Sequence, residues 1–265
     1  MPYASNNGVK IYYEVEGEGP PLVLAHGGGR DLEPWRGYGY VEALRDDFQL
    51  ILFDMRGHGR SDKLHEPSGY SVRLWADDVL AVLDDIGIGK AHYFGFSLSA
   101  RVGFQLATHH AARFNSFILL SISPYDIPEV SVKGFKALIE GLQLLLTDAD
   151  AYLLRQERRL GRSLTSEEKT RLLSQDAETL VRLSEAWLDS PPLSDEDLAG
   201  ILAPCLVLCG ELDENGFYSD AMESVKRIPN AEFVSLPGLN HPQAWARSDM
   251  TLPRVKEFLA RVSKT

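Results

Sequence analysis

The sequence has few cysteines and few basic residues, and these shortages exclude several kinds of protein. Its 265 residues include two cysteines, Cys205 and Cys209, which share one apolar run and which we expect to be buried packing residues. Basic residues number 27 against 38 acidic ones, and the net charge of −11 opposes binding to nucleic acid or to anionic membranes. No run approaches the roughly 20 apolar residues of a transmembrane helix, and Met1–Lys10 lacks the apolar stretch of a signal peptide. We therefore expect a cytoplasmic protein without a nucleic-acid or membrane partner.

Seven short runs rich in aliphatic and β-branched residues predict β-strands. They are Ile11–Val15, Leu22–Ala25, Leu50–Phe53, Ala91–Phe94, Phe117–Ser121, Leu206–Leu208 and Phe233–Leu236. Between most of them lie stretches with helical spacing, namely Trp35–Asp46, Ser71–Ile86, Ser97–His110, Tyr218–Ile228 and Gln243–Val262. This alternation predicts a mostly parallel sheet with helices on both faces and with the first run as an antiparallel edge strand. Ligands bind such a sheet beyond the carboxyl ends of its strands.

The alternation of strands and helices stops between Pro124 and Ala203. This stretch has helical pattern and many charges, but no convincing strand. Because it begins after one strand and ends before another, we expect it to sit over the same edge of the sheet. We expect residues 1–123 and 204–265 to form one α/β core domain, and residues 124–203 to form a helical cap over the crevice.

A candidate nucleophile follows the strand at Ala91–Phe94, in the segment Gly95-Phe96-Ser97-Leu98-Ser99. Helical pattern begins at once, as in a nucleophile elbow, where small residues two positions either side of the serine permit a sharp turn. Gly95 and Ser99 are both small, although glycine is the usual residue at the second position. Ser97 is the predicted nucleophile, because centring the motif on Ser99 would put Arg101 at a crowded position. Alone, such a string also occurs in ordinary loops.

A serine nucleophile needs a general base, and the base needs a third group that orients it. Of the seven histidines, His241 is the one in a loop that follows a later strand at the correct edge of the sheet. Asp213 lies at the turn after the strand at Leu206–Leu208, and we assign it as the acid. The competing carboxylates are Glu211, Glu214 and Asp220.

The strand at Leu22–Ala25 ends in His26-Gly27-Gly28-Gly29, which suits the presentation of backbone N–H groups. We expect the N–H groups of Gly28 and Leu98 to form an oxyanion hole, with Gly27 as the alternative to Gly28. His26 is expected to bond the loop backbone. A phosphate-binding turn is disfavoured, because no Gly-x-Gly-x-x-Gly or Gly-Lys-Ser/Thr follows.

The substrate pocket is expected to be mostly apolar and to include the aliphatic face of the cap. The candidate residues from the rest of the chain are Gly27, Trp35, Phe96, Leu98, Tyr125, Phe217 and Trp245. Each of the aromatic residues has core packing as its alternative role. Arg30 and Arg36 follow the oxyanion loop and are candidates either for binding an anionic substrate or for ordinary solvated side chains.

Taken together, these motifs resemble the α/β-hydrolase superfamily, and more narrowly its small lidded esterase, lactonase and carbon–carbon-bond hydrolase branch. The resemblance covers nearly the whole chain, includes Asp54-Met55-Arg56-Gly57-His58-Gly59-Arg60-Ser61, and has the family's order of Ser, Asp and His. It implies an eight-stranded sheet whose second strand is antiparallel, a cap after the sixth strand, and catalysis without a metal or organic cofactor. The eighth strand would be Tyr3–Ser5. The departures from the family pattern are Ser99 in place of glycine and Ala111 where proline is frequent.

These features predict a serine hydrolase of the carboxylic ester hydrolase or lactonase type, acting on a small, largely apolar substrate through an acyl-enzyme. Serine at the elbow disfavours dehalogenases and epoxide hydrolases, which use aspartate there. Two alternatives stay open: a carbon–carbon bond hydrolase with the same triad, and a ligand receptor on the hydrolase scaffold. The sequence predicts no oligomeric state.

Overall fold

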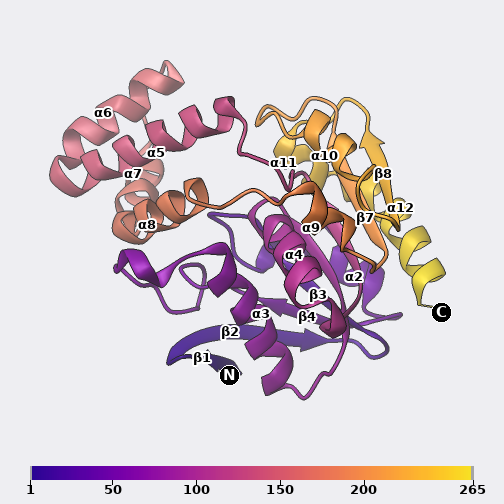
Figure 1. The fold of residues 1–265 in the computed structure, drawn as a ribbon. Helices are drawn as coiled ribbons and strands as arrows, with labels where there is room; N and C mark the ends of the chain where they lie inside the picture. The colour runs from indigo at the N-terminus through magenta and orange to yellow at the C-terminus, as the bar shows by residue number, and fades with distance from the viewer. Residues whose placement is uncertain (1, 264–265) are drawn as a thin grey trace.

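One sheet of eight strands forms the centre of the protein (Figure 1). The computed structural model describes residues 2–263. In chain order the strands are β1 (Tyr3–Asn6), β2 (Val9–Glu16), β3 (Pro21–Ala25), β4 (Gln49–Phe53), β5 (Ala91–Phe96), β6 (Phe114–Leu120), β7 (Cys205–Gly210) and β8 (Ala231–Leu236). They lie in the order β1-β2-β4-β3-β5-β6-β7-β8, and only the two pairings of β2 are antiparallel. The predicted eight-stranded, mostly parallel sheet is thereby confirmed.

The position of β2 corrects one detail of the predicted sheet. β2 is antiparallel as expected, but it pairs with β4 on one side and with β1 on the other, so β1 is the edge strand. The turn between β1 and β2 is Asn7-Gly8, with φ angles of 51° and 86°. Two such residues with positive φ are typical of a two-residue hairpin, and Asn-Gly is its strongest short-range signal. The hairpin places the N-terminal segment outside β2.

Helices cover both faces of the sheet, as predicted. On one face lie α3 (Val72–Asp85), α4 (Leu98–His109) and α10 (Tyr218–Ser224); on the other lie α1 (Glu33–Gly37), α2 (Tyr40–Leu44), α11 (His241–Ala246) and α12 (Ser248–Val262). Single-turn 3₁₀ helices occur at Pro67–Gly69 and Ala111–Arg113. Successive side chains of one strand point to opposite faces, so in β3 Val23 and Leu24 enter different apolar clusters. Both cysteines of β7 are fully buried.

Two of the predicted helices are each divided in two. Gly39 adopts φ 82° between α1 and α2, and its N–H bonds the Arg36 carbonyl, so it ends the first helix as a left-handed cap. Arg247 leaves the helical region between α11 and α12, at φ −86° and ψ 63°. Helical spacing of apolar residues continues across both breaks, which is why the sequence pattern did not reveal them.

Five helices lie between β6 and β7. They are α5 (Glu129–Thr147), α6 (Ala149–Leu160), α7 (Ser166–Leu173), α8 (Ala177–Leu188) and α9 (Asp195–Ala199). The first four, here called the cap helices, stand to one side of the sheet (Figure 1), and Leu142, Ala177 and Val181 form a small apolar cluster within them. By contrast, α9 packs on the main core, where Leu198 is fully buried. The division into a core domain and a cap at residues 124–203 stays a prediction.

None of the helices described within residues 2–263 combines the length and the apolar character needed to span a membrane.

A buried ion pair fixes the loop that follows β4. The side chains of Arg56, in this loop, and Asp78, on α3, are 3% and 1% exposed. Arg56 Nε donates to Asp78 Oδ2 at 2.6 Å and Nη2 donates to Oδ1 at 2.5 Å, while Asn6 Nδ2 donates to Oδ1 at 2.8 Å. The fork geometry of the guanidinium suits this two-point contact. The loop after β4 is therefore held to α3 and to the end of β1.

Replacing Asp78 with asparagine is expected to destabilise the protein strongly, because it leaves the buried Arg56 charge without its counter-ion. We expect the free energy of unfolding, measured by urea denaturation, to fall by about 3–5 kcal/mol. The control is Asp249→Asn, which breaks the exposed Arg247–Asp249 pair, with side chains 54% and 62% exposed; it should leave stability nearly unchanged. Equal effects of the two substitutions would contradict the role given to Asp78.

Candidate active site

Ser97 occupies a strained turn between β5 and α4. Its backbone has φ 56° and ψ −118°, a conformation that residues other than glycine rarely adopt. The turn brings the two elements so close together that a Cβ atom added to Gly95 would lie 2.6 Å from the Ser99 carbonyl oxygen. The absence of a side chain at Gly95 therefore permits the turn, and the turn directs Ser97 out of the sheet edge.

Ser99 occupies the position where the usual elbow has glycine. Its hydroxyl forms a hydrogen bond that explains how a serine is accommodated there. The residue is fully buried, and Oγ donates a short hydrogen bond to the carbonyl of His26, in the loop after β3. Its backbone carbonyl accepts a hydrogen bond from the Tyr93 hydroxyl at 2.7 Å. A buried hydroxyl costs little free energy when it is hydrogen-bonded. Ser99 thereby joins the elbow to the loop that carries Gly28.

His241 and Asp213 extend a chain of hydrogen bonds from Ser97. His241 Nε2 lies 2.9 Å from Ser97 Oγ, and Nδ1 lies 2.8 Å from Asp213 Oδ2. The Asp213 side chain is fully buried, and its Oδ1 accepts the Asn215 N–H at 2.9 Å. The thiol of Cys209 lies 3.6 Å from Asp213 Oδ2. In this arrangement the imidazole can take the serine proton while the carboxylate orients it and balances its charge.

The other carboxylates considered for the acid position make different contacts. Glu214 accepts the backbone N–H of His241 at 2.9 Å, not the ring. Glu211 accepts from Ser235 Oγ at 2.8 Å, and Asp220 lies on α10. Among the described residues, no group of three or more His, Cys, Asp or Glu side chains is arranged to hold a metal ion.

Gly28 and Leu98, the residues predicted for an oxyanion hole, both line the cavity that contains Ser97. Leu98 is the first residue of α4, so its N–H has no acceptor within the helix. A Cβ atom at Gly28 would lie 3.5 Å from Leu98 Cδ2, which places the two residues side by side. At Gly27, a Cβ would lie 2.8 Å from a Phe96 ring carbon, so this glycine faces the packed side of the loop.

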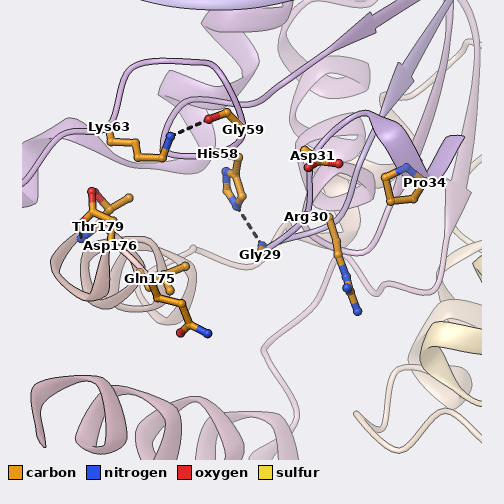
Figure 2. Close-up of a pocket in the computed structure, with 12 residues that line it drawn as sticks. Gly29, Arg30, Asp31, Pro34, His58, Gly59, Lys63, Gln175, Asp176 and Thr179 are labelled. Atoms are coloured by element: carbon orange, nitrogen blue, oxygen red, sulfur yellow. Dashed lines mark hydrogen bonds between the residues drawn. The ribbon is translucent and has the colours of Figure 1, made fainter. Parts of the chain in front are cut away.

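Two buried histidines hold the loops around this position. His26 Nε2 accepts the Met55 N–H at 3.1 Å, and His58 Nε2 accepts the Gly29 N–H at 2.9 Å (Figure 2). Each Nδ1 lies within hydrogen-bonding distance of a backbone carbonyl, at 2.8 and 3.1 Å respectively. Both rings are therefore neutral, with the proton on Nδ1. Consistently, burial lowers the pKa of His26 to about 4 and that of His58 to about 3.

An apolar cavity of about 260 Å³ lies above Ser97 and His241. From the core, Phe217 lines it as predicted, together with His58 and Asn215, which the sequence analysis missed. The cap helices supply the residues that we call the roof: Phe135, Leu138, Leu180, Leu183, Ser184 and Trp187. Four of these lie on α8 at positions i, i+3, i+4 and i+7, which is one face of a helix. That spacing is the signal that could have identified them.

Several residues predicted to contact substrate are absent from the cavity lining. Phe96 stacks on Trp245 with ring centroids 4.7 Å apart, and Trp245 meets Trp35 at 5.0 Å. These rings belong to the apolar cluster on the α11 and α12 face, and Trp35 is fully buried. Tyr125 lies in the segment that leads to α5. The prediction for Trp35, Phe96, Trp245, Tyr125 and Gly27 is corrected accordingly: packing, not ligand contact, accounts for these residues.

The same aromatic residues still influence the site, because they support the histidine. The His241 ring lies 5.1 Å from the Phe96 ring and 6.0 Å from the Phe217 ring, centroid to centroid. Phe96 in turn rests on Trp245. The imidazole is therefore held on an aromatic layer whose other side is continuous with the core.

A second, more polar hollow of about 340 Å³ adjoins the apolar cavity and shares Gly29, His58 and Leu180 with it. Figure 2 shows Arg30 extending away from Lys63, whose ammonium donates to the Gly59 carbonyl at 2.6 Å. Asp31 and Asp176 also line this hollow.

Arg36, the other arginine considered for an anionic substrate, is engaged elsewhere. Its guanidinium forms ion pairs with Glu14, Glu16 and Glu33. Of the two arginines, only Arg30 lines the hollow that adjoins the cavity of Ser97. Arg36 is therefore no longer a candidate for binding an anionic substrate.

Removing the Ser99 hydroxyl should weaken the link between the elbow and the oxyanion loop. In Ser99→Ala the His26 carbonyl loses its donor in a buried position, so we expect the free energy of unfolding to fall by about 1–3 kcal/mol. Urea denaturation measures the change. Ser174→Ala is a suitable control, because the exposed Ser174 hydroxyl bonds a carbonyl of its own helix. No difference between these two variants would refute the link.

Because the buried histidines have lowered pKa values, we expect the stability of the folded protein to fall on acidification. A third buried histidine, His92, lies on β5. The ordinary pKa of histidine is 6.5, and burial lowers it to about 4 for His26 and His92 and to about 3 for His58. The unfolded chain therefore binds more protons below pH 6.5, and stability is lost as the pH falls from there towards 4. Each such histidine contributes a slope of up to about 1.4 kcal/mol per pH unit. Urea denaturation across this range should show a shallower slope for His58→Gln than for the wild type.

The comparisons with known proteins identify the family. Residues 20–200 match the family model described as the alpha/beta hydrolase fold. Among curated proteins, the chain is 35% identical over 121 residues to a putative carbamate hydrolase RutD of Azorhizobium caulinodans, covering 46% of this chain and 44% of that protein. It is 37% identical over 116 residues to the pimeloyl-[acyl-carrier protein] methyl ester esterase of Aeromonas hydrophila, covering 44% and 43%. These two alignments thus span less than half of the relatives' lengths.

A solved structure extends the similarity over nearly all of the chain. The enol-lactonase from Burkholderia xenovorans LB400 superposes with a TM-score of 0.77 at 27% identity, covering 98% of this chain and 100% of that one. The eight-stranded sheet, with its single antiparallel strand and with helices on both faces, agrees with this likeness. The chain belongs to the alpha/beta hydrolase fold family.

Proposed function

We propose that this protein hydrolyses a carboxylic ester or lactone through an acyl-enzyme formed on Ser97. The observation that carries the proposal is the continuous chain of hydrogen bonds from Ser97 Oγ through His241 to the buried Asp213, at the base of an apolar cavity. A serine hydroxyl alone is a weak nucleophile, and an adjacent base oriented by a third group activates it. The names of the relatives, which include an ester hydrolase and a lactonase, support the same reaction class.

The acylation half-reaction follows from these positions. Ser97 Oγ attacks the substrate carbonyl carbon while His241 Nε2 takes the hydroxyl proton, and the carbonyl oxygen becomes an oxyanion. The N–H groups of Gly28 and Leu98 receive this oxyanion, and each such donor lowers the barrier by about 3 kcal/mol. Collapse of the tetrahedral intermediate breaks the bond to the leaving oxygen, which takes the proton from His241. Asp213 stabilises the transient imidazolium.

Deacylation uses the same groups in the same order. His241 takes a proton from a water molecule, whose oxygen attacks the acyl carbon. The second tetrahedral intermediate places its oxyanion at Gly28 and Leu98, and its collapse releases the carboxylic acid as Ser97 Oγ regains the proton. No other reactant is required, so the balance is one water consumed for each ester bond cleaved.

The two hollows suit a substrate that has one apolar part and one polar part. The roof and Phe217 surround the space above Ser97 with aliphatic and aromatic side chains, which suits a hydrocarbon group. The adjoining hollow offers Arg30 and Lys63 beside two carboxylates, which suits a polar, hydrogen-bonding group. Gly29 and His58 line both hollows, so a substrate whose carbonyl meets Ser97 in the apolar cavity can extend its polar group into the adjoining hollow.

Turnover of a short-chain aryl ester tests the proposal directly. We expect the wild type to hydrolyse the ester and to gain the mass of one fluorophosphonate adduct, and we expect Ser97→Ala to lose the adduct and to lower kcat by about 10⁴-fold or more. The control is Ser184→Ala, which alters the roof but not the hydrogen-bond chain and should keep the adduct.

The same experiment separates the proposal from its competitors. Cleavage of a vinylogous diketone in preference to the aryl ester would assign the triad to carbon–carbon bond hydrolysis instead. A folded wild type with neither turnover nor adduct would overturn the hydrolase proposal, and ligand binding without turnover would then indicate a receptor.

A further inference from the structure

Arg101 is a buried cation that the reaction proposed above does not use. It lies in the first turn of α4, one helical turn after Ser97, and only 3% of the residue is exposed. A positive charge in the first turn of a helix is disfavoured by the helix dipole, and burial adds a further penalty. Burial lowers the pKa of Arg101 to about 10, so the side chain is still charged at neutral pH. A cation kept at such a place requires compensating contacts.

Three backbone carbonyls supply this compensation, and they come from two segments far apart in the sequence. Arg101 Nη1 donates to the Ser123 carbonyl at 2.7 Å and to the Tyr125 carbonyl at 2.6 Å, and Nη2 donates to the Pro191 carbonyl at 2.6 Å. Ser123 and Tyr125 lie between β6 and α5, while Pro191 lies between α8 and α9. These segments are the outgoing and returning connections of the cap helices.

The two connections also contact each other. The Leu193 N–H donates to the Pro124 carbonyl at 2.9 Å, so the segments run side by side where Arg101 meets them. On the other side, the Arg101 N–H bonds the Ser97 carbonyl at 3.1 Å within the helix that starts at the nucleophile. One side chain therefore connects the base of the cap helices to the catalytic turn.

We propose that Arg101 is a positioning residue, which fixes the roof of the cavity relative to Ser97 by holding both cap connections to the first turn of α4. This inference rests on the proposed function, because it concerns substrates bound under the roof. The triad and the oxyanion loop come from β5, α4 and the loops after β3, β7 and β8, so they do not depend on the cap connections for their place. Loosening the connections should therefore affect substrates that need the roof and spare those that do not.

The experiment compares an aryl acetate with an aryl hexanoate in the wild type, Arg101→Met and Arg101→Lys. Methionine removes all the donors, while lysine keeps the charge and can reach fewer carbonyls, so it carries the test if the methionine variant fails to fold. We expect kcat/KM for the hexanoate to fall by about tenfold, mainly through KM, and kcat/KM for the acetate to stay within about twofold. The fluorophosphonate adduct on Ser97 should persist in both variants.

Hydrogen exchange provides a readout that does not depend on turnover. Amides in residues 123–128 and 189–194 and in the cap helices should exchange about tenfold faster in the Arg101 variants, with β5 and β6 unchanged. Arg113→Met is the matched control, because Arg113 also bonds two backbone carbonyls, those of Ile88 and Gly89, but at the start of β6 and away from the cap. It should alter neither the ester ratio nor the exchange of the cap connections.

Two results would overturn the inference. One is an unchanged hexanoate-to-acetate ratio with unchanged exchange in a folded Arg101 variant; the other is an equal loss for both esters with faster exchange throughout the core, which would mean general destabilisation. If the wild type hydrolyses neither ester, the proposed function fails, whereas the exchange comparison still decides whether Arg101 holds the cap.

Discussion

The close approach of α4 to β5 at Ser97 is the constraint on which the rest of the site depends. A single turn must pass from strand to helix with φ 56°, and it does so because Gly95 leaves room for the Ser99 carbonyl. The same turn exposes the Leu98 N–H at the start of the helix and directs Ser97 Oγ towards His241. The predicted nucleophile, the N–H donor predicted for the oxyanion hole and the contact of Ser97 with His241 thus follow from one backbone geometry, and the local strain is supported by the packed strands on either side.

The turn at Ser97 is surrounded by uncharged polar contacts and, beneath His241, by apolar side chains. The imidazoles of His26 and His58 hold the neighbouring loops through accepted N–H bonds, so they add no charge where an oxyanion would form. The Arg56–Asp78 pair anchors the loop that carries His58 to α3. Phe96 packs against one side of the His241 ring and is itself stacked on Trp245. Preorganised donors in such a setting act more strongly than they would in water.

The sequence revealed the sheet and the elbow because their signals are local. The strand runs and the small residues around Ser97 each depend on a few neighbouring positions, and the fold and family they predicted are confirmed. The assignment of pocket residues failed for Trp35 and Trp245, since an aromatic residue near a loop does not disclose which face of the sheet it covers. The aliphatic face of the cap was expected to line the pocket, but its residues were not identified, for a related reason: helical spacing marks an apolar face on α8, but only the tertiary arrangement shows that this face meets Ser97.

The adjacency of the two cap connections has a consequence for how this scaffold can change. Because the Leu193 N–H bonds the Pro124 carbonyl, the chain enters and leaves the cap helices at nearly one point. The entropic cost of closing a loop rises only slowly with its length, so segments of quite different size fit between the same anchors. The sheet and the turn at Ser97 then keep their structure, while the helices between the two connections can be replaced by others. Under the proposed function, a change in those helices would alter the selectivity for substrate and leave the arrangement of Ser97, His241 and Asp213 in place.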